Sequence, residues 1–157
     1  MNFRLTGLAV FALVIGGQVA LAAAPVEGTW KSEDGEGIVE VAPCAALAGA
    51  YCGRIAWIKK PRDADGKPVT DAKNPDAALQ KRPVCGIEVL SGMQPAADGS
   101  YGGGTIYDPE EGKSYSGALK LIGPVLKVTG FVELPILGKV SDSEVWTRVT
   151  TPFERCK

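Results

Sequence analysis

Residues 113–133 read KSYSGALKLIGPVLKVTGFVE, and in two stretches of this segment apolar and polar side chains alternate. In the first stretch, residues 113–121, one face holds Tyr, Gly and two Leu, and the other holds two Ser and one Lys. The second stretch, residues 125–133, alternates in the same way. Alternation with a period of two residues predicts half-buried β-strands. The Gly-Pro pair at residues 123–124 predicts a tight turn between them, so the segment is expected to form a β-hairpin.

Short runs rich in Val, Ile, Thr, Tyr and Gly recur along the rest of the chain, separated by turn residues. This pattern is typical of all-β proteins. The predicted strands are residues 28–32, 37–41, 51–58, 85–90, 101–107, 113–121, 125–133 and 144–149. Most connections are short, which favours antiparallel neighbours. About eight such strands close into a barrel just wide enough for a small ligand, so we predict an antiparallel barrel, with a β-sandwich as the alternative.

Three connections differ from the short turns. Residues 59–73 are charged and rich in turn residues, and we expect them to form a long exposed loop. The Asn-Pro-Asp sequence at residues 74–76 supplies an N-cap, a proline suited to the first helical position and an acidic first turn. We therefore predict one short helix over residues 77–82, which Pro83 ends. Residues 135–138 are expected to form a loop before the last strand.

The first 24 residues have the order of a secretory signal peptide. Arg4 is their only charged residue, residues 8–15 are an unbroken apolar run, and small residues suited to cleavage follow at positions 20–24. This order predicts a signal peptide over residues 1–24 and a single domain over residues 25–157. The apolar run is short for a bilayer span, which takes about 20 residues, and no other apolar stretch is long enough. We therefore expect a periplasmic or secreted protein without a transmembrane segment.

The four cysteines, Cys44, Cys52, Cys85 and Cys156, all lie in the domain expected to be exported. An even number of cysteines in an oxidising compartment predicts disulfides, and three pairings are possible. Cys44 and Cys52 flank a Gly/Ala-rich turn, which favours a bridge across a hairpin and leaves Cys85 to pair with Cys156. A zinc site is disfavoured because the chain contains no His and no Cys-x-x-Cys pair.

The composition argues against several kinds of chemistry. With 17 Lys and Arg against 18 Asp and Glu, the chain lacks the basic excess of a nucleic-acid-binding protein. The absence of His removes the commonest general base and the usual Ser and Cys triads. The Asp-x-Asp-Gly segment at residues 63–66 matches only part of a calcium-binding EF-hand loop. Carboxylates remain as candidates for acid–base catalysis, and turns and caps account well for them: Asp71, Asp76, Asp108, Glu110 and Glu111. We predict no enzymatic activity, no cofactor and no metal.

Aromatic side chains on the predicted strands are candidates for the wall of a binding pocket. We place Arg54 at the mouth of a cup lined by Trp57, Tyr107 and Tyr115, where the guanidinium would anchor the polar part of a ligand. Strict alternation puts Arg54 and Trp57 on opposite faces of one strand. Both can serve one pocket only if the strand bulges between them or if Arg54 reaches over the rim. Ordinary core packing is the alternative role for each aromatic residue.

Several short motifs occur in the order that characterises one bacterial family. They are Gly28-Thr29-Trp30, Cys52-Gly53-Arg54-Ile55, Lys73-Asn74-Pro75-Asp76, Gly86, the run from Gly103 to Pro109, Gly112-Lys113-Ser114-Tyr115, Gly130, Gly138 and Trp146-Thr147-Arg148. With these motifs the chain resembles the exported bacterial proteins catalogued as domain of unknown function 2147. The resemblance implies an exported protein with a lipocalin-like antiparallel barrel, and it implies no activity.

The chain also shares a looser likeness with lipocalins in general. Lipocalins carry Gly-x-Trp on the first strand and an Arg near the end of the barrel that packs over the Trp. Trp30 and Arg148 are similar to that pair, and the likeness implies a structural contact that closes one end of the barrel.

Three functions are possible for a barrel of this kind. The first, which we favour, is the binding of a small apolar or amphipathic molecule in the interior. The second is a non-enzymatic envelope protein that docks on another protein, the cell wall or the membrane surface through exposed apolar residues. The apolar stretch at residues 131–137 is the candidate surface, and as a mobile loop it would serve equally well as a lid over a cavity. The third is a hydrolase that uses two carboxylates.

Overall fold

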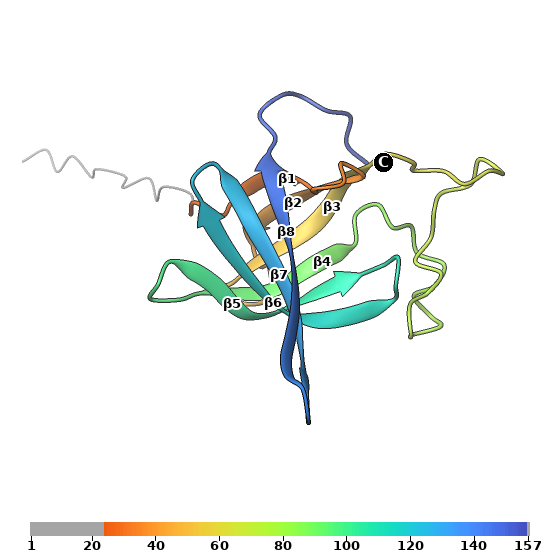
Figure 1. Ribbon diagram of the computed structural model, residues 1–157. Coiled ribbons are helices and arrows are strands. Elements are labelled where there is room, and N and C mark those ends of the chain that lie inside the picture. The colour runs from red at the N-terminus through yellow and green to blue at the C-terminus, as the bar shows by residue number, and fades with distance from the viewer. Residues whose placement is uncertain (1–23, 157) are drawn as a thin grey trace, which may run out of the picture.

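The computed structural model describes residues 24–156, in which eight strands form one sheet. The strands are β1 (Gly28–Lys31), β2 (Gly37–Pro43), β3 (Tyr51–Ile58), β4 (Glu88–Pro95), β5 (Ser100–Asp108), β6 (Lys113–Ile122), β7 (Val125–Leu134) and β8 (Gly138–Arg148). Each strand pairs antiparallel with the next, and β8 pairs with β1, so the sheet closes into a barrel (Figure 1). The predicted antiparallel barrel is therefore confirmed. The predicted signal peptide, residues 1–24, lies outside the described residues except for Ala24.

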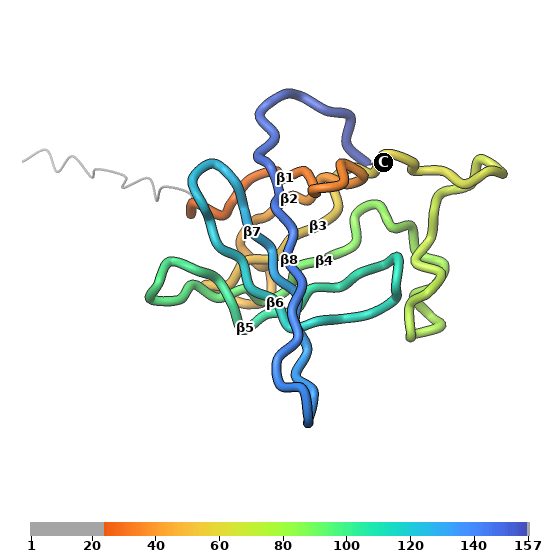
Figure 2. The backbone as a smooth tube through the Cα atoms, in the orientation of Figure 1, coloured from red at the N-terminus to blue at the C-terminus, as the bar shows by residue number. Residues whose placement is uncertain are grey.

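Because consecutive strands are neighbours, the connections alternate between the two ends of the barrel. We call the two ends the closed end and the open end. The connections at the closed end are compact: residues 44–50, 96–99 and 123–124. The connections at the open end include the longest excursion of the chain (Figure 2): residues 32–36, 59–87, 109–112 and 135–137.

A tryptophan and an arginine plug the closed end. Trp30 is fully buried, and its indole N–H donates a hydrogen bond to the Val26 carbonyl at 2.9 Å. The guanidinium carbon of Arg148 lies 4.0 Å from the centre of the Trp30 ring. Arg148 also donates hydrogen bonds to the carbonyls of Glu27 and Pro25, at 2.8 and 2.6 Å. The guanidinium thus covers the indole and ties the segment before β1 to the end of β8.

The interior near the closed end is filled by side chains from the inner faces of the strands. The largest fully buried side chains besides Trp30 include Leu90, Met93, Leu119, Leu126 and Val41. Packing is tight at Gly117, where an added Cβ would lie 2.3 Å from the Met93 methyl carbon. These side chains leave no room for a ligand in this half of the barrel.

Two disulfides brace the barrel. Cys44 pairs with Cys52 across the β2–β3 connection, and Cys85 pairs with Cys156, 71 residues further along the chain. The backbone N–H of Cys156 donates to the carbonyl of Ala56 at 2.8 Å, so the C-terminal segment lies along β3. This is the pairing that the spacing of the cysteines favours.

The β7–β8 hairpin extends beyond the rest of the barrel (Figure 1). Its register runs from Val125 opposite Thr147 to Leu134 opposite Gly138, whereas β8 pairs with β1 only through Thr147 and Arg148. The loop predicted at residues 135–138 is therefore only the tip of this hairpin, and β8 begins at Gly138 rather than at residue 144. Of the apolar stretch at residues 131–137, Phe131, Val132 and Leu134 pair as strand, and Ile136 and Leu137 lie in the turn at the tip.

The predicted helix over residues 77–82 is wrong. Within residues 24–156 the chain forms no helix, and residues 77–81 make consecutive turns. In these turns the Leu79 N–H bonds to the Asp76 carbonyl and the Arg82 N–H bonds to the Leu79 carbonyl. So few residues before Pro83 cannot repay the cost of helix nucleation. It follows that no helix in this part of the chain is long and apolar enough to cross a membrane.

Candidate functional site

A pocket of about 930 Å³ opens at the open end of the barrel. Its walls are largely apolar and come from seven strands, β2 to β8, and from the long β3–β4 connection. The apolar lining residues include Val39, Ile55, Ile58, Val69, Val84, Val89, Leu90, Ile106, Val128 and Trp146. Trp146 is 7% exposed, so its ring forms part of the wall. The pocket therefore lies directly above the filled half of the barrel and has the lining of a site for apolar groups.

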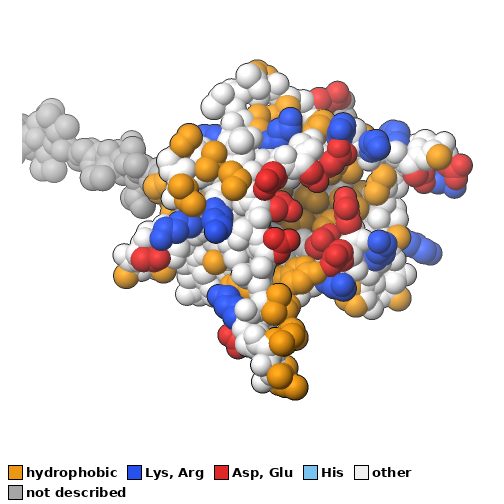
Figure 3. Space-filling view, viewed as in Figure 1, with side chains coloured by type: hydrophobic (Ala, Val, Ile, Leu, Met, Phe, Trp, Pro, Cys, Tyr) orange, Lys and Arg blue, Asp and Glu red, His pale blue; other side chains and the backbone are white. Residues whose placement is uncertain are grey.

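Acidic side chains surround the mouth of this pocket. Figure 3 shows Asp and Glu side chains gathered around a hollow with hydrophobic side chains inside it. The lining includes seven carboxylates and only two lysines, Lys60 and Lys73. The carboxylates belong to Asp34, Glu36, Asp108, Glu110, Glu111, Asp142 and Glu144. We call these seven residues the acidic rim.

Local hydrogen bonds hold several rim carboxylates in place. The Trp146 indole N–H donates to Glu144 Oε2 at 2.9 Å, which fixes a carboxylate beside the aromatic wall. Asp108 Oδ1 accepts the backbone N–H groups of Glu110 and Glu111 at 2.7 and 3.1 Å, so Asp108 shapes the β5–β6 turn. Hydrogen bonds from the Ser32 hydroxyl and the Glu36 backbone lower the pKa of Asp34.

The rim residue Glu111 accepts a hydrogen bond from the Tyr115 hydroxyl. This bond and the nearby Lys113 ammonium lower the pKa of Glu111, and the same bond raises the pKa of Tyr115. Tyr115 is therefore protonated and Glu111 ionised at neutral pH.

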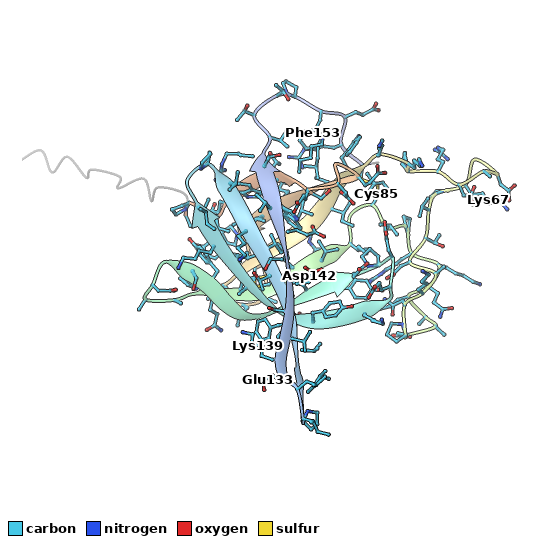
Figure 4. The ribbon with its side chains drawn as sticks, in the orientation of Figure 1. Lys67, Cys85, Glu133, Lys139, Asp142 and Phe153 are labelled. Atoms are coloured by element: carbon cyan, nitrogen blue, oxygen red, sulfur yellow. A yellow bond between two sulfur atoms is a disulfide. The ribbon has the colours of Figure 1, made fainter. Side chains whose placement is uncertain are left out.

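The long connection between β3 and β4 folds back over one side of the mouth. Its outer part is exposed, as predicted, and Lys67 marks its far tip (Figure 4). Its inner part includes buried residues: Asp71 is fully buried, and Val69 and Val84 line the pocket. We call the inner part, residues 69–84, the lid segment.

Asp71 pins the lid segment to the barrel. Its Oδ1 accepts the Tyr107 hydroxyl at 2.6 Å, and its Oδ2 accepts Asn74 Nδ2 at 2.7 Å. The same Oδ2 forms an ion pair with Arg82, with Nη2 at 2.8 Å. Burial alone would raise the pKa of Asp71, but the hydrogen bonds and the Arg82 charge outweigh it and hold this pKa below its usual value. Asp71 therefore acts as a charged anchor for the lid segment.

A glycine allows the lid segment to touch the β5–β6 turn. Gly112 has a φ of +69°, and an added Cβ would lie 1.9 Å from the carbonyl oxygen of Lys73. Only glycine fits this contact without moving the backbone. Three of the motifs quoted above, residues 73–76, 103–109 and 112–115, thus meet at the mouth of the pocket.

The structure divides the four residues predicted to bind a ligand into two pairs. Tyr107 and Tyr115 line the pocket. Arg54 and Trp57 lie outside it: the Arg54 side chain is 62% exposed and bonds to Glu88 Oε2 at 2.9 Å, and Trp57 borders a separate surface depression of about 430 Å³.

A β-bulge explains the position of the second pair. Ile38 pairs with Trp57 and Val39 pairs with Ile55, so Ala56 is an extra residue in β3. The bulge brings Arg54 and Trp57 to the same face of the strand, but this is the outer face.

Most of the acidic rim was not identified from the sequence. Asp34, Glu36, Asp142 and Glu144 were not among the candidate residues, and Trp146 was assigned no specific role. One pattern in the sequence could have located part of the rim. In a barrel of consecutive strands every second connection lies at the same end. Two of the four connections at the open end, residues 32–36 and 109–112, are acidic.

The rim carboxylates do not converge on a point. In the described part of the chain, residues 24–156, no group of three or more Cys, Asp or Glu side chains is arranged to hold a metal ion. At the Asp-x-Asp-Gly segment, Asp63 Oδ1 instead accepts the backbone N–H groups of Asp65 and Lys67, at 3.0 and 2.9 Å. That carboxylate closes a turn.

Comparisons with known proteins agree with the architecture. Residues 28–148 match a family described as an uncharacterized protein conserved in bacteria (DUF2147). Among solved structures, the barrel is similar to protein HP1028 from the human pathogen Helicobacter pylori, which is described as belonging to the lipocalin family. The TM-score is 0.63 at 21% identity, and the alignment covers 82% of this chain and 85% of that one. No curated protein matches. At this level of identity the likeness shows the fold, which is lipocalin-like.

Proposed function

The chain belongs to the DUF2147 family of bacterial proteins, and from this premise we propose that it is a non-enzymatic protein that binds a small apolar or amphipathic molecule in the pocket of its barrel. One observation carries the proposal: a pocket of about 930 Å³ with apolar walls opens at one end of a barrel whose other end is filled. Pockets that bind small molecules typically enclose about 300–1,000 Å³ behind largely apolar walls.

Aromatic rings support the proposal because they suit a flat or extended apolar ligand. Tyr107, Tyr115 and Trp146 line the pocket from three different strands, β5, β6 and β8. In this proposal Tyr107 and Tyr115 contribute to the ligand-binding wall. Arg54 and Trp57 have no part in it because they lie on the outer face.

The carboxylates at the mouth give little support to a hydrolase. A general acid at neutral pH needs a raised pKa. The pKa values of Asp34 and Glu111 are lowered instead, and Asp108 accepts two backbone N–H groups that shape a turn. These features favour a binding role for the open end.

We further propose that the protein works outside the cytoplasm, in the periplasm or after secretion. The pattern of residues 1–24 and two disulfides that use all four cysteines support this location. Disulfides form and persist mainly in oxidising compartments. Detection of the protein in the periplasmic or culture fraction, with an N-terminus cleaved near residue 24, would test it.

Native mass spectrometry of protein purified without denaturant or organic solvent tests the binding function. We expect a small molecule bound at one copy per chain, which solvent extraction identifies. A Gly130→Leu variant should lose it, because Gly130 lines the pocket and its Cβ would have only ordinary contact with Tyr115, so the added side chain enters free space. Lys127→Leu adds a similar side chain to the outer face of the same strand and should keep the ligand.

The binding proposal would be abandoned under two joint conditions. The Gly130→Leu variant would have to carry the same small molecules as the unchanged protein, or neither would carry any, and an apolar fluorescent dye would have to bind equally to both. A loss of the bound molecule in the Lys127→Leu control alone would indicate that the molecule binds on the outer surface of the barrel. Circular dichroism of both variants shows whether the barrel remains folded.

One observation favours docking on an envelope partner as a second function. The β7–β8 hairpin carries exposed apolar side chains around its tip (Figure 3): Val132, Leu134, Ile136, Leu137 and Val140. Ile136 is 95% exposed, and a group of exposed apolar side chains of this kind is typical of an interaction surface. A photo-crosslinking amino acid at position 136 should give one discrete adduct in living cells if the hairpin docks on a protein, and the same group at position 127 should give none.

A further inference from the structure

We propose that the pocket selects amphipathic organic cations, in which an apolar body enters the barrel and a cationic head group stays at the mouth among the rim carboxylates. This selectivity, which rests on the binding function proposed above, names the class of ligand. The apolar pocket supplies the binding site, and the acidic rim supplies the preference for one sign of charge.

The charge at the mouth departs from that of the whole chain. The chain is nearly neutral, with 17 Lys and Arg, 18 Asp and Glu and a formal net charge of −1. The pocket lining, in contrast, includes seven carboxylates and two lysines. A concentration of one sign around an apolar opening attracts ligands of the opposite sign, because low-dielectric walls focus the field into the opening.

Most of this negative charge is not neutralised by neighbouring lysines. Glu36 pairs with Lys59 at 2.6 Å and Glu111 pairs with Lys113 at 3.4 Å. None of the other five rim carboxylates forms an ion pair within residues 24–156, which leaves them available to a bound cation: Asp34, Asp108, Glu110, Asp142 and Glu144.

The five carboxylates stand on two sides of the mouth. Asp34 comes from the β1–β2 turn, and Asp142 and Glu144 come from β8, which is the neighbour of β1. Asp108 and Glu110 come from the end of β5 and the β5–β6 turn, across the barrel in the strand order. Both lysines of the lining lie on the β3–β4 connection, so neither is on β8 or the β1–β2 turn. The residues of β8 that line the pocket include two carboxylates and no Lys or Arg, and the nearby cation on the β1–β2 side is Lys59, which pairs with Glu36. A head group beside β8 therefore meets carboxylates without a cation among the lining residues of that strand.

The best position for a cationic head group is beside Glu144 and Trp146. Both residues line the pocket and are two positions apart on β8, and the indole N–H holds the carboxylate at 2.9 Å. A cation there meets a carboxylate and an aromatic ring, and both attract positive charge. Asp142 lies two residues further along the same strand, at the mouth (Figure 4).

The spread of the rim argues for an organic cation rather than a metal ion. A bound metal needs several ligand atoms within about 2–2.6 Å of one point. The described residues, 24–156, contain no such group of three or more acidic or Cys side chains. A methylated or substituted ammonium group is larger and interacts with carboxylates at longer range, which suits side chains spread around an opening.

Three detergents with the same ten-carbon chain test the sign of the preferred charge. Decyltrimethylammonium, decyl maltoside and decyl sulfate are titrated into the full protein by calorimetry, below their micelle concentrations. We expect the cation to bind about tenfold more tightly than the maltoside, and the sulfate to bind more weakly than the maltoside. Added salt should narrow both differences, because it screens charges at an open mouth.

A double variant, Asp142→Asn with Glu144→Gln, tests the residues. It should weaken binding of decyltrimethylammonium about threefold to tenfold and leave binding of the maltoside unchanged. Glu144→Gln retains an acceptor for the Trp146 indole, so the wall is preserved. Glu133→Gln is the matched control, because Glu133 lies on the same hairpin toward its tip (Figure 4) and outside the pocket lining.

The outcomes separate the selectivity from the binding function. Equal affinities for the three detergents, or a double variant that weakens cation and maltoside alike, would overturn the preference for cations while the binding function stands. Failure of all three detergents to bind would remove the binding function itself. Binding of the cation that is weakened in the double variant and unchanged in Glu133→Gln supports both.

Discussion

The two ends of this barrel are built from the same alternating strands but differ in what fills them. At the closed end, Trp30 is fully buried beneath the Arg148 guanidinium, and large apolar side chains occupy the interior. At the open end, apolar walls surround empty space, and carboxylates ring the opening. The difference shows that strand alternation specifies the barrel, while the connections and the size of the inward side chains decide which end can hold a ligand.

This contrast predicts that stability and binding depend on different ends of the barrel. Substitutions at the closed end remove packing contacts and hydrogen bonds on which the fold depends. Substitutions at the mouth change groups that are already exposed to water and should alter binding more than folding.

The largest expected effect is that of Trp30→Ala. It should lower the free energy of unfolding by about 4 kcal/mol, because it opens a cavity in the filled half of the barrel and removes the surface under Arg148. Tyr115→Ala at the mouth should cost less than about 1 kcal/mol, since that side chain faces an open pocket. Urea unfolding with both disulfides intact measures the two values, and similar losses would contradict the contrast between the ends.

An intermediate effect is expected for Asp71→Asn at the lid segment. The variant keeps the shape of the side chain but removes the negative charge to which Arg82, Tyr107 and Asn74 donate hydrogen bonds. We expect the free energy of unfolding to fall by about 2 kcal/mol at neutral pH. Asp76→Asn is the control, since Asp76 is exposed in the same connection.

The pH dependence of this effect has a defined sign. Because the pKa of Asp71 is lower in the folded protein than its usual value of 3.8, its carboxylate contributes stability above that value. This contribution is lost as the pH falls through the lowered pKa. The stability difference between the protein and Asp71→Asn should therefore be full at pH 7 and shrink in acid, as measured by urea unfolding across pH. A difference that stayed constant would show that Asp71 is not a charged anchor.

The smallest expected effect compares two arginines. Arg148→Met should cost about 1 kcal/mol, because it removes the contact with the Trp30 ring and two hydrogen bonds to carbonyls. Arg54→Met should cost less than about 0.5 kcal/mol, since its pair with Glu88 is exposed. Thermal unfolding of the two variants ranks them, and the reverse order would mean that the plug at the closed end contributes little.

Much of the barrel could be predicted from the sequence because one face of each strand is buried. The alternation over residues 113–133 locates β6, β7 and their turn to within one residue at each end. The favoured cysteine pairing also matches the structure, since Cys44 and Cys52 flank a single turn. These features depend on neighbours in the sequence, and local patterns report them well.

The site was harder to predict because it depends on contacts between distant segments. Nothing in the residues around Ala56 marks the bulge that moves Trp57 to the outer face. Asp71 looks like an ordinary loop residue until Tyr107, 36 positions away, donates to it. Strand β8 was predicted to start late because its exposed residues 138–144 lack alternation and are held only by their pairing with β7.

The Cys85–Cys156 disulfide also determines how the molecule would respond to mechanical tension. It joins two residues that are 71 positions apart, and strands β4 to β8 lie between them. A force applied to the two termini passes through the sulfur atoms and bypasses those five strands. The disulfide thereby prevents about 250 Å of chain from extending. Pulling would unfold β1, β2, β3 and the long connection. The β5–β6 turn and the β7–β8 hairpin would remain inside a covalent loop.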